Sequence, residues 1–175
     1  DFLMLSVLRL VLVLIIFIVL YLTAKRAVMP ISLFSLFSVI LAFGMLVRFS
    51  VRPHLVSYAF LILLIFLLYS FYLYKQNIKV LYVLPLLFLL WANLHMGAVL
   101  GAGIFFLFVI TISAKYYFSK GNDPVNNLTV SELKTLAVIF LLSIAALLVN
   151  PHFISTYQYA ISHSQMESLD DIQEW

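Results

Sequence analysis

Residues 84–103 read LPLLFLLWANLHMGAVLGAG, and they place Asn93 and His95 in the middle of an uncharged run. Residues 81–114 contain no Lys, Arg, Asp or Glu. One straight helix over that run would be about 50 Å long, whereas the hydrocarbon core of a bilayer is about 30 Å thick. We therefore predict that the run folds back as two membrane spans, with the break at Trp91–Gly97.

The residue types at this break favour a turn at a membrane face. Asn93 is a weak helix former, and Gly97 tolerates turn conformations. Trp91 has the amphipathic side chain that is enriched at membrane interfaces. We expect Asn93 and His95 to lie together at one face of the membrane.

The composition excludes a soluble domain. The chain is 65% hydrophobic and 10% charged, whereas soluble domains are about 25% charged. Long unbroken apolar blocks, rather than short alternating segments, predict an all-α polytopic transmembrane helical bundle and not a barrel. The net charge of +3 reflects basic residues that flank spans, so it does not indicate nucleic acid as a partner. The absence of cysteine excludes disulfides and thiol chemistry.

Six spans are predicted within a transmembrane domain over residues 1–152. Their bounds are 2–23, 28–47, 55–74, 80–92, 97–117 and 134–149. Residues 153–175 are too polar to span, and we expect an interfacial or extracytoplasmic tail there. Because the chain starts at Asp1 and lacks the pattern of a signal peptide, we expect it to be a fragment of a longer protein.

Basic residues divide unequally between the two sides of this topology. When the first span starts outside, two arginines fall in outer loops, Arg48 and Arg52, and seven basic residues fall inside: Lys25, Arg26, Lys75, Lys79, Lys115, Lys120 and Lys134. This positive-inside bias predicts that both ends of the segment are extracytoplasmic.

The same topology gathers the histidines on the outer face, together with most of the acidic residues. That face receives His54, His95, His152 and His163, and also Asp170, Asp171 and Glu174. We take seven residues as candidates for a substrate or phosphate site: Arg48, Arg52, His54, Asn93, His95, Asn150 and His152. The sequence identifies no catalytic residue and no metal ligand set.

Each candidate has an ordinary reading beside the functional one. Arg48 and Arg52 are either headgroup contacts or a phosphate clamp, because guanidinium groups bind phosphate oxygens bidentately. Asn93 and His95 either bond to the backbone at a helix break or bind a substrate, and a histidine there would suit phosphate binding or proton transfer. Asn150 precedes Pro151 and is most simply part of a helix stop.

Two further interpretations concern metal and helix packing. Three histidines and an acid of the tail, His54, His95, His152 and Asp170 or Glu174, are candidates to converge on a divalent metal, although the chain has no HExxH or paired-histidine spacing. Gly97, Gly101 and Gly103 have the spacing of small residues that permits close approach of another helix.

Several short motifs together resemble a group of bacterial integral membrane proteins related to the GT-C class of glycosyltransferases. They are Arg52-Pro53-His54, Leu84-Pro85, Trp91-Ala92-Asn93-Leu94-His95 with Met96-Gly97 after it, Asn150-Pro151-His152 and Glu174-Trp175. The WxNxH element is the specific one. The resemblance implies a location in the bacterial inner membrane and use of a polyprenyl-phosphate-linked sugar at the extracytoplasmic face. The acidic motif that the class carries in its first outer loop has no counterpart here, so no catalytic acid is assigned.

Three functions follow as hypotheses. The first is a glycosyltransferase-like membrane enzyme whose partners are membrane lipid and a lipid-linked sugar donor. The second is a transporter or lipid-carrier-binding protein without bond chemistry. The third is a structural subunit that packs against another helix through Gly97 and Gly101.

Overall fold

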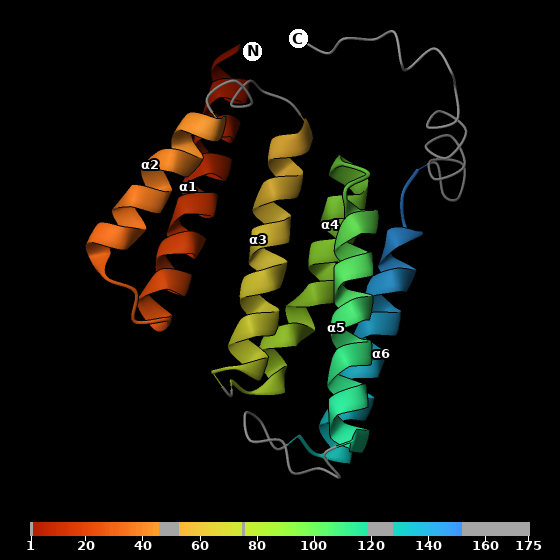
Figure 1. Ribbon diagram of the computed structural model, residues 1–175. Coiled ribbons are helices and arrows are strands. Elements are labelled where there is room, and N and C mark those ends of the chain that lie inside the picture. The colour runs from red at the N-terminus through yellow and green to blue at the C-terminus, as the bar shows by residue number, and fades with distance from the viewer. Residues whose placement is uncertain (1, 46–52, 75, 119–127, 152–175) are drawn as a thin grey trace, which may run out of the picture.

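The computed structural model describes residues 2–45, 53–74, 76–118 and 128–151 (Figure 1). Every regular element in that part of the chain is a helix. In order, they are α1 (Phe2–Arg26), α2 (Ile31–Met45), α3 (Pro53–Tyr72), the 3-10 helix η2 (Ile78–Val83), α4 (Leu84–Leu94), α5 (Ala98–Phe118) and α6 (Val130–Leu147).

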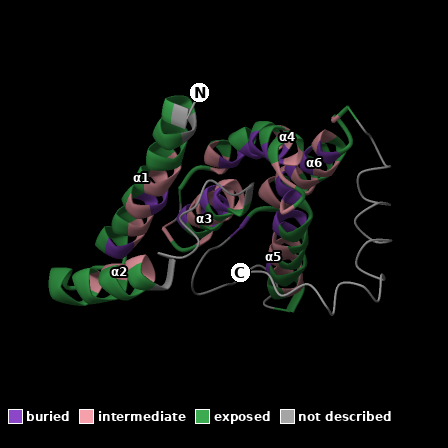
Figure 2. Ribbon diagram, turned by 90° about the horizontal axis from the view of Figure 1, so that it is seen from above, coloured by how far each residue is buried: buried purple, intermediate pink, exposed green. Residues whose placement is uncertain are grey.

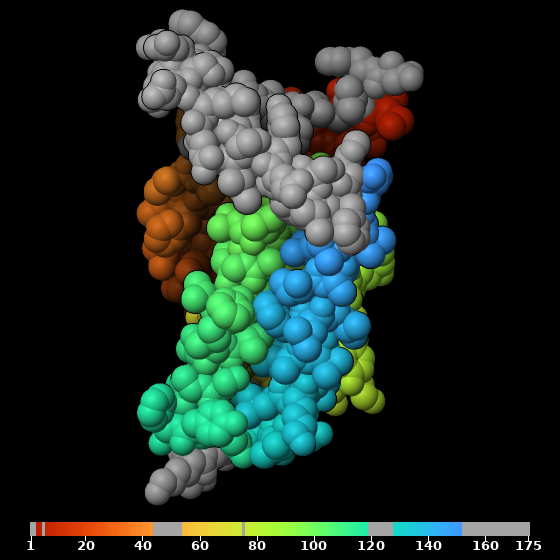
Figure 3. Space-filling view, turned by 90° about the vertical axis from the view of Figure 1, so that its right-hand side faces the viewer, coloured from red at the N-terminus to blue at the C-terminus, as the bar shows by residue number. Residues whose placement is uncertain are grey.

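The prediction of an all-helical, membrane-type chain is confirmed at this level. Four helices, α1, α3, α5 and α6, are long and apolar enough to cross a membrane, while α2 and the segment formed by η2 and α4 are shorter apolar helices. The outward faces of the long helices support the same conclusion. α5 and α6 lie side by side on the face shown in Figure 3, and they expose large apolar side chains such as Leu107 and Leu141.

The helices run alternately up and down, so each connection lies at one of two ends (Figure 1). We call the end where α3 and α5 begin and α4 and α6 end the histidine end. The opposite end, where α1, α3 and α5 finish and α6 begins, we call the lysine end. Five of the seven predicted inner basic residues lie in described segments at the lysine end: Lys25, Arg26, Lys79, Lys115 and Lys134.

The main core lies between α3, η2, α4, α5 and α6 (Figure 2). Its largest fully buried side chains are Trp91, Phe71, Phe88 and Phe105. Phe88 stacks on both Trp91 and Phe105, with ring centroids 5.9 and 6.3 Å apart, so aromatic contacts run from α4 into α5. We call this unit the α3–α6 bundle.

α1 and α2 form a hairpin that attaches to the bundle mainly through α1. Ile16 packs with Leu55 and Ala59 of α3 in a small second core. α2 contacts α1 through few residues, among them the edge-to-face pair Tyr21 and Phe34, whose centroids are 5.7 Å apart. Most of α2 is therefore exposed in Figure 2.

The α1–α2 connection is a helix C-cap with an unsuitable residue at its key position. The backbone N–H of Met29 donates to the Ala24 carbonyl at 3.0 Å, and the backbone N–H of Val28 donates to the Lys25 carbonyl at 3.2 Å. This is the Schellman pattern, in which the residue at the position of Val28 is usually glycine because it takes a left-handed conformation. Val28 has φ 55°, an unfavourable value for a β-branched residue.

Two predicted span starts differ from the structure for identifiable reasons. α6 begins at Val130 rather than residue 134, because Thr129 and Glu132 form a capping box: the Thr129 hydroxyl accepts from the Glu132 amide, and Glu132 accepts from the Thr129 amide at 2.9 Å. The predicted span 80–92 is two elements, since η2 gives way to α4 at Leu84, with Pro85 in the first helical turn.

The remaining bounds differ by a few residues. Predicted spans 2–23, 28–47, 55–74 and 97–117 correspond to α1, α2, α3 and α5 as given above. The long uncharged run does fold back, but α4 continues to Leu94, so the break is confined to His95, Met96 and Gly97. The predicted tail, residues 153–175, lies outside the described residues.

Candidate functional site

The histidine end brings together four of the seven predicted site residues. His54 is in the first turn of α3, Asn93 is in the last turn of α4, His95 follows α4, and Asn150 follows α6. These residues come from sequence positions up to about one hundred apart, yet the alternating helices return each of them to the same end (Figure 1).

A chain of hydrogen bonds connects α3, α4 and the start of α5 at this end. The indole Nε1–H of Trp91 donates to the Ser57 hydroxyl at 2.9 Å. The Ser57 oxygen lies 2.6 Å from Nδ1 of His95. The backbone N–H of Gly97 donates to the same Nδ1 at 3.0 Å. Ser57 is therefore the link between the two rings, and the sequence analysis did not identify it.

These contacts determine the tautomer of His95. A backbone N–H only donates, so Nδ1 must be an acceptor and carries no proton. The Ser57 hydroxyl accepts from Trp91 and in turn donates to Nδ1. A neutral imidazole has one N–H, and here it must be at Nε2. His95 thus presents a hydrogen-bond donor on the side of the ring away from Ser57.

His54 lies against His95. Their ring centroids are 5.1 Å apart and the rings are nearly perpendicular, at 86°. His95 lies in the connection between α4 and α5, outside both helices. Burial lowers the pKa of its imidazole below the ordinary value of 6.5, and the charge of a protonated His54 lowers that pKa further. The two donors at Nδ1 also favour the neutral ring, because a protonated Nδ1 could not accept from them.

Gly97 is required by the close approach of α3. A Cβ at residue 97 would lie 2.1 Å from the Ser57 oxygen and 2.9 Å from Nδ1 of His95. Any side chain here would therefore displace the hydroxyl that holds the imidazole. The predicted role of this glycine in close packing is confirmed, and its neighbour is α3 of the same chain.

The other two glycines differ from each other. A Cβ on Gly101 would lie 2.4 Å from the Trp91 ring, whereas one on Gly103 would meet nothing within 4 Å. Gly103 is not close-packed within the described residues, so its predicted role in packing against another helix stays a prediction. Gly101 is buried inside the chain against α4, which leaves this residue no room for an external helix.

Trp91 is buried inside the protein, so its side chain does not face a membrane interface as expected. Only 1% of the residue is exposed. Its ring stacks between Phe60 and Phe88, with centroids 5.7 and 5.9 Å away. The indole N–H is buried at no cost because Ser57 accepts from it.

The amides of the two asparagines bond to backbone carbonyls. Nδ2 of Asn93 donates at 2.8 Å to the carbonyls of Leu89 and Val149, which joins α4 to the end of α6. Nδ2 of Asn150 donates to the Leu147 carbonyl at 2.9 Å. For both residues the structure supports the ordinary reading, in which they bond to the backbone and satisfy carbonyls at the end of α6.

Three predicted site residues, Arg48, Arg52 and His152, lie outside the described residues, as do His163, Asp170, Asp171 and Glu174. Arg52 immediately precedes α3, and His152 follows the last described residue. Within the described segments, no group of three or more potential metal-binding side chains comes together. The metal hypothesis therefore concerns residues beyond those segments as well as His54 and His95.

Comparison with known proteins gives no assignment: no family model, no curated protein and no solved structure matches the chain. The case for function therefore depends on the residues themselves.

Proposed function

We propose that the protein binds the phosphate of a polyprenyl-phosphate-linked sugar at the histidine end, as the membrane-embedded part of a glycosyltransferase-like protein. His95 and His54 contact the phosphate, and Arg48 and Arg52, from the segment that leads into α3, supply positive charge. The feature that carries the proposal is the inferred Nε2–H donor of His95, because Ser57 and the Gly97 amide orient the ring and Trp91 holds Ser57.

Backbone geometry supports an anion at this place. The N-termini of α3 and α5 both lie at the histidine end, and helix N-termini favour negative charge. The C-terminus of α6, which disfavours it, has the Leu147 carbonyl occupied by the amide of Asn150 and the nearby Val149 carbonyl occupied by that of Asn93. The local arrangement of donors therefore suits a phosphate better than a cation.

The proposal includes a topology. In it, α2 and the segment of η2 and α4 cross the membrane together with the four long helices, which gives six spans. The lysine end faces the cytoplasm of a bacterial cell and the histidine end faces outward. The segregation of five lysine and arginine residues at one end supports this orientation.

Binding of a short-chain polyprenyl phosphate to the protein in nanodiscs is the direct test. We expect the double variant Arg52→Ala, His95→Phe to bind at least tenfold more weakly than the wild type, because a charged and an oriented donor are both lost. Thr135→Val on α6, at the opposite end, is the matched control and should bind as the wild type does. Equal binding by the double variant would contradict the proposal.

A second candidate is binding of the lipid carrier without bond chemistry. Glu132 is the one acidic residue among the described segments, and it lies at the lysine end in the α6 capping box. Sugar transfer needs a base or a metal ligand near the acceptor, and within those segments no carboxylate is at the histidine end. Proteoliposomes with a lipid-linked sugar separate the two: binding with no sugar transfer supports the carrier function, whereas transfer that is lost in His95→Phe supports the enzyme.

A further inference from the structure

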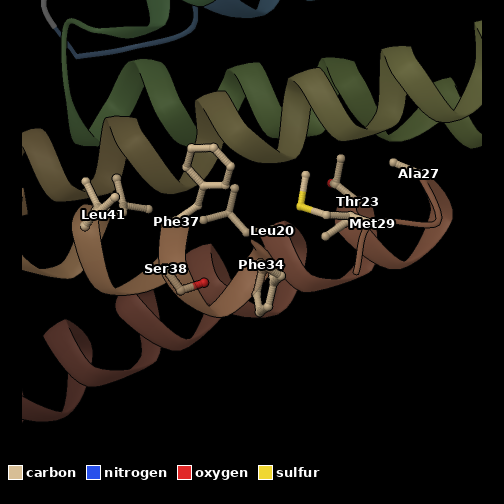
Figure 4. A pocket seen from close by; sticks show the side chains of 10 residues that line it. Leu20, Thr23, Ala27, Met29, Phe34, Phe37, Ser38 and Leu41 are labelled. Carbon is tan, nitrogen blue, oxygen red and sulfur yellow. The ribbon is translucent and has the colours of Figure 1, made fainter. Parts of the chain in front are cut away.

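A second candidate site lies in the hairpin of α1 and α2 and contains no histidine. A cavity of about 410 Å³ opens between α1 and α2 (Figure 4). Leu20 and Ala24 line it from α1, and Phe34, Phe37 and Leu41 line it from α2. The polar atom of Thr23, which also lines it, is already used, because its hydroxyl donates to the Val19 carbonyl at 2.8 Å. The walls thus suit a hydrocarbon chain.

The cavity runs in the direction of a lipid chain. Its lining extends from Ala27 and Met29, at the lysine end, to Leu41 on α2. Between Ile31, where α2 begins, and Leu41 the helix rises about 15 Å, which is half the thickness of a hydrocarbon core. One end of the cavity is therefore near the membrane surface and the other is near the bilayer centre.

A cation stands at the surface end. Lys25 is exposed in the last turn of α1, at the same end of the hairpin as Ala27 and Met29, which line the surface end of the cavity. The neighbouring Arg26 is engaged elsewhere: its guanidinium bonds to the Ser70 hydroxyl and lies over the Phe66 ring at 4.5 Å. Lys25 is thus the exposed cation of this turn for which no such contact is described.

The geometry points to a binding site for an anionic phospholipid, with one acyl chain between α1 and α2 and the phosphate beside Lys25. This site lies in the hairpin, with its headgroup part at the lysine end. Binding of the lipid chain does not depend on the proposed function, whereas the assignment to the inner leaflet rests on the topology proposed with it. Charge and orientation both favour a lipid of the inner leaflet over a second copy of the chain, since α2 carries no charged residue from Ile31 to Met45 to complement Lys25.

A phosphatidylglycerol with a photoreactive group midway along one acyl chain tests the chain-binding part. In nanodiscs we expect labelling to concentrate on residues 29–41 of the wild type. Ser38 lines the cavity, while Ser35 is exposed and does not. Ser38→Leu should fill the space and reduce labelling at least fivefold, and Ser35→Leu, the matched control, should not. Circular dichroism checks that both variants keep their helix content.

The headgroup part is tested with a phosphatidylcholine that carries the same chain. We expect the wild type to label about fivefold less with it, which is the effect of one lysine beside an anionic group. Lys25→Gln should remove this preference, whereas Lys79→Gln, which neutralises another exposed lysine at the same end, should keep it.

Three outcomes would overturn the inference. The first is equal labelling of Ser38→Leu and Ser35→Leu, which would show that the chain does not enter the cavity. The second is an identical response of the two lysine variants, which would indicate general surface charge. The third is cross-linking of two copies through α2, which would assign the cavity to a second chain.

Discussion

The bundle and the hairpin are both built from apolar helices, yet they are packed very differently. In its apolar window α3 has 33% of its residues buried inside the protein, whereas α1 has 11%. The bundle places aromatic rings and a hydrogen-bond chain between its helices, while α2 has a cavity on the side that faces α1. Hydropathy predicts that a helix enters the membrane, and it does not predict whether the helix contacts protein or lipid there.

The bundle should tolerate no extra atom at Gly101. We expect Gly101→Ala to destabilise it by about 2 kcal/mol, because the new Cβ meets the Trp91 ring, and overpacking typically costs about 1–3 kcal/mol. Trp91 has no free direction in which to move, since rings stack on it. Thermal unfolding in detergent measures the loss.

Gly103→Ala is the matched control, on the same helix and with open space around residue 103. It should be neutral or slightly stabilising, because alanine favours a helix over glycine by about 0.5–1 kcal/mol. Equal melting temperatures for the two variants would show that α4 and α5 are not packed as described.

Asn93 joins two helices of the bundle, and we expect Asn93→Leu to cost about 1–2 kcal/mol because two carbonyls lose their donor. Proteolysis should then detect opening of the α6 end before the rest of the bundle. Thr135→Val is a suitable comparison, since its hydroxyl bonds only within its own helix, to the Ser131 carbonyl at 2.9 Å. A loss no larger than that of Thr135→Val would argue against the α4–α6 link.

The hairpin should gain stability where the bundle cannot. Val28→Gly should stabilise it by about 1 kcal/mol, since a left-handed conformation costs an L-residue about 1–2 kcal/mol and glycine avoids that cost. Hydrogen exchange at the end of α1 is the measurement. Ala27→Gly, one residue earlier, is the control and should lower protection there. Faster exchange in Val28→Gly would contradict the cap geometry.

The smallest expected effect is on pH dependence at the histidine end. The pKa of His95 is lower in the folded protein than its ordinary 6.5. At pH values between the folded pKa and 6.5, the folded state therefore binds fewer protons than the unfolded state. Stability should be full above pH 6.5 and decline as the pH falls through the folded pKa. His95→Phe should flatten this decline, as read from melting temperatures between pH 8 and pH 5. Parallel profiles for the two proteins would show that His95 does not titrate as inferred.

Helix content, the fold-back near His95 and the gathering of His54 and His95 at one end were predictable from the sequence. All three follow from apolar length and from the alternation of direction that successive helices impose. The division into four long and two shorter apolar helices was not predictable, because the bounds of the shorter ones depend on caps and on a 3-10 turn.

Pairwise contacts were beyond the sequence. Nothing in WANLH shows that Ser57, on another helix, accepts from Trp91, so Trp91 was placed at an interface and Ser57 was overlooked. Asn93 was correctly predicted to be a polar group that needs a partner, but one of its two acceptors is the Val149 carbonyl, which follows α6 far along the sequence. Spacing along one helix identifies which residues share a face, whereas such a partner depends on how two helices are rotated against each other.

The 3-10 geometry of η2 has a consequence for depth. Six of the seventeen residues from Ile78 to Leu94 are in η2, and a 3-10 helix rises about 2.0 Å per residue where an α-helix rises about 1.5 Å. The stretch therefore reaches about 28 Å instead of about 25 Å, close to the full width of the hydrocarbon layer. In the proposed six-span topology, the imidazole of His95 would lie about 3 Å deeper in the membrane without that extension.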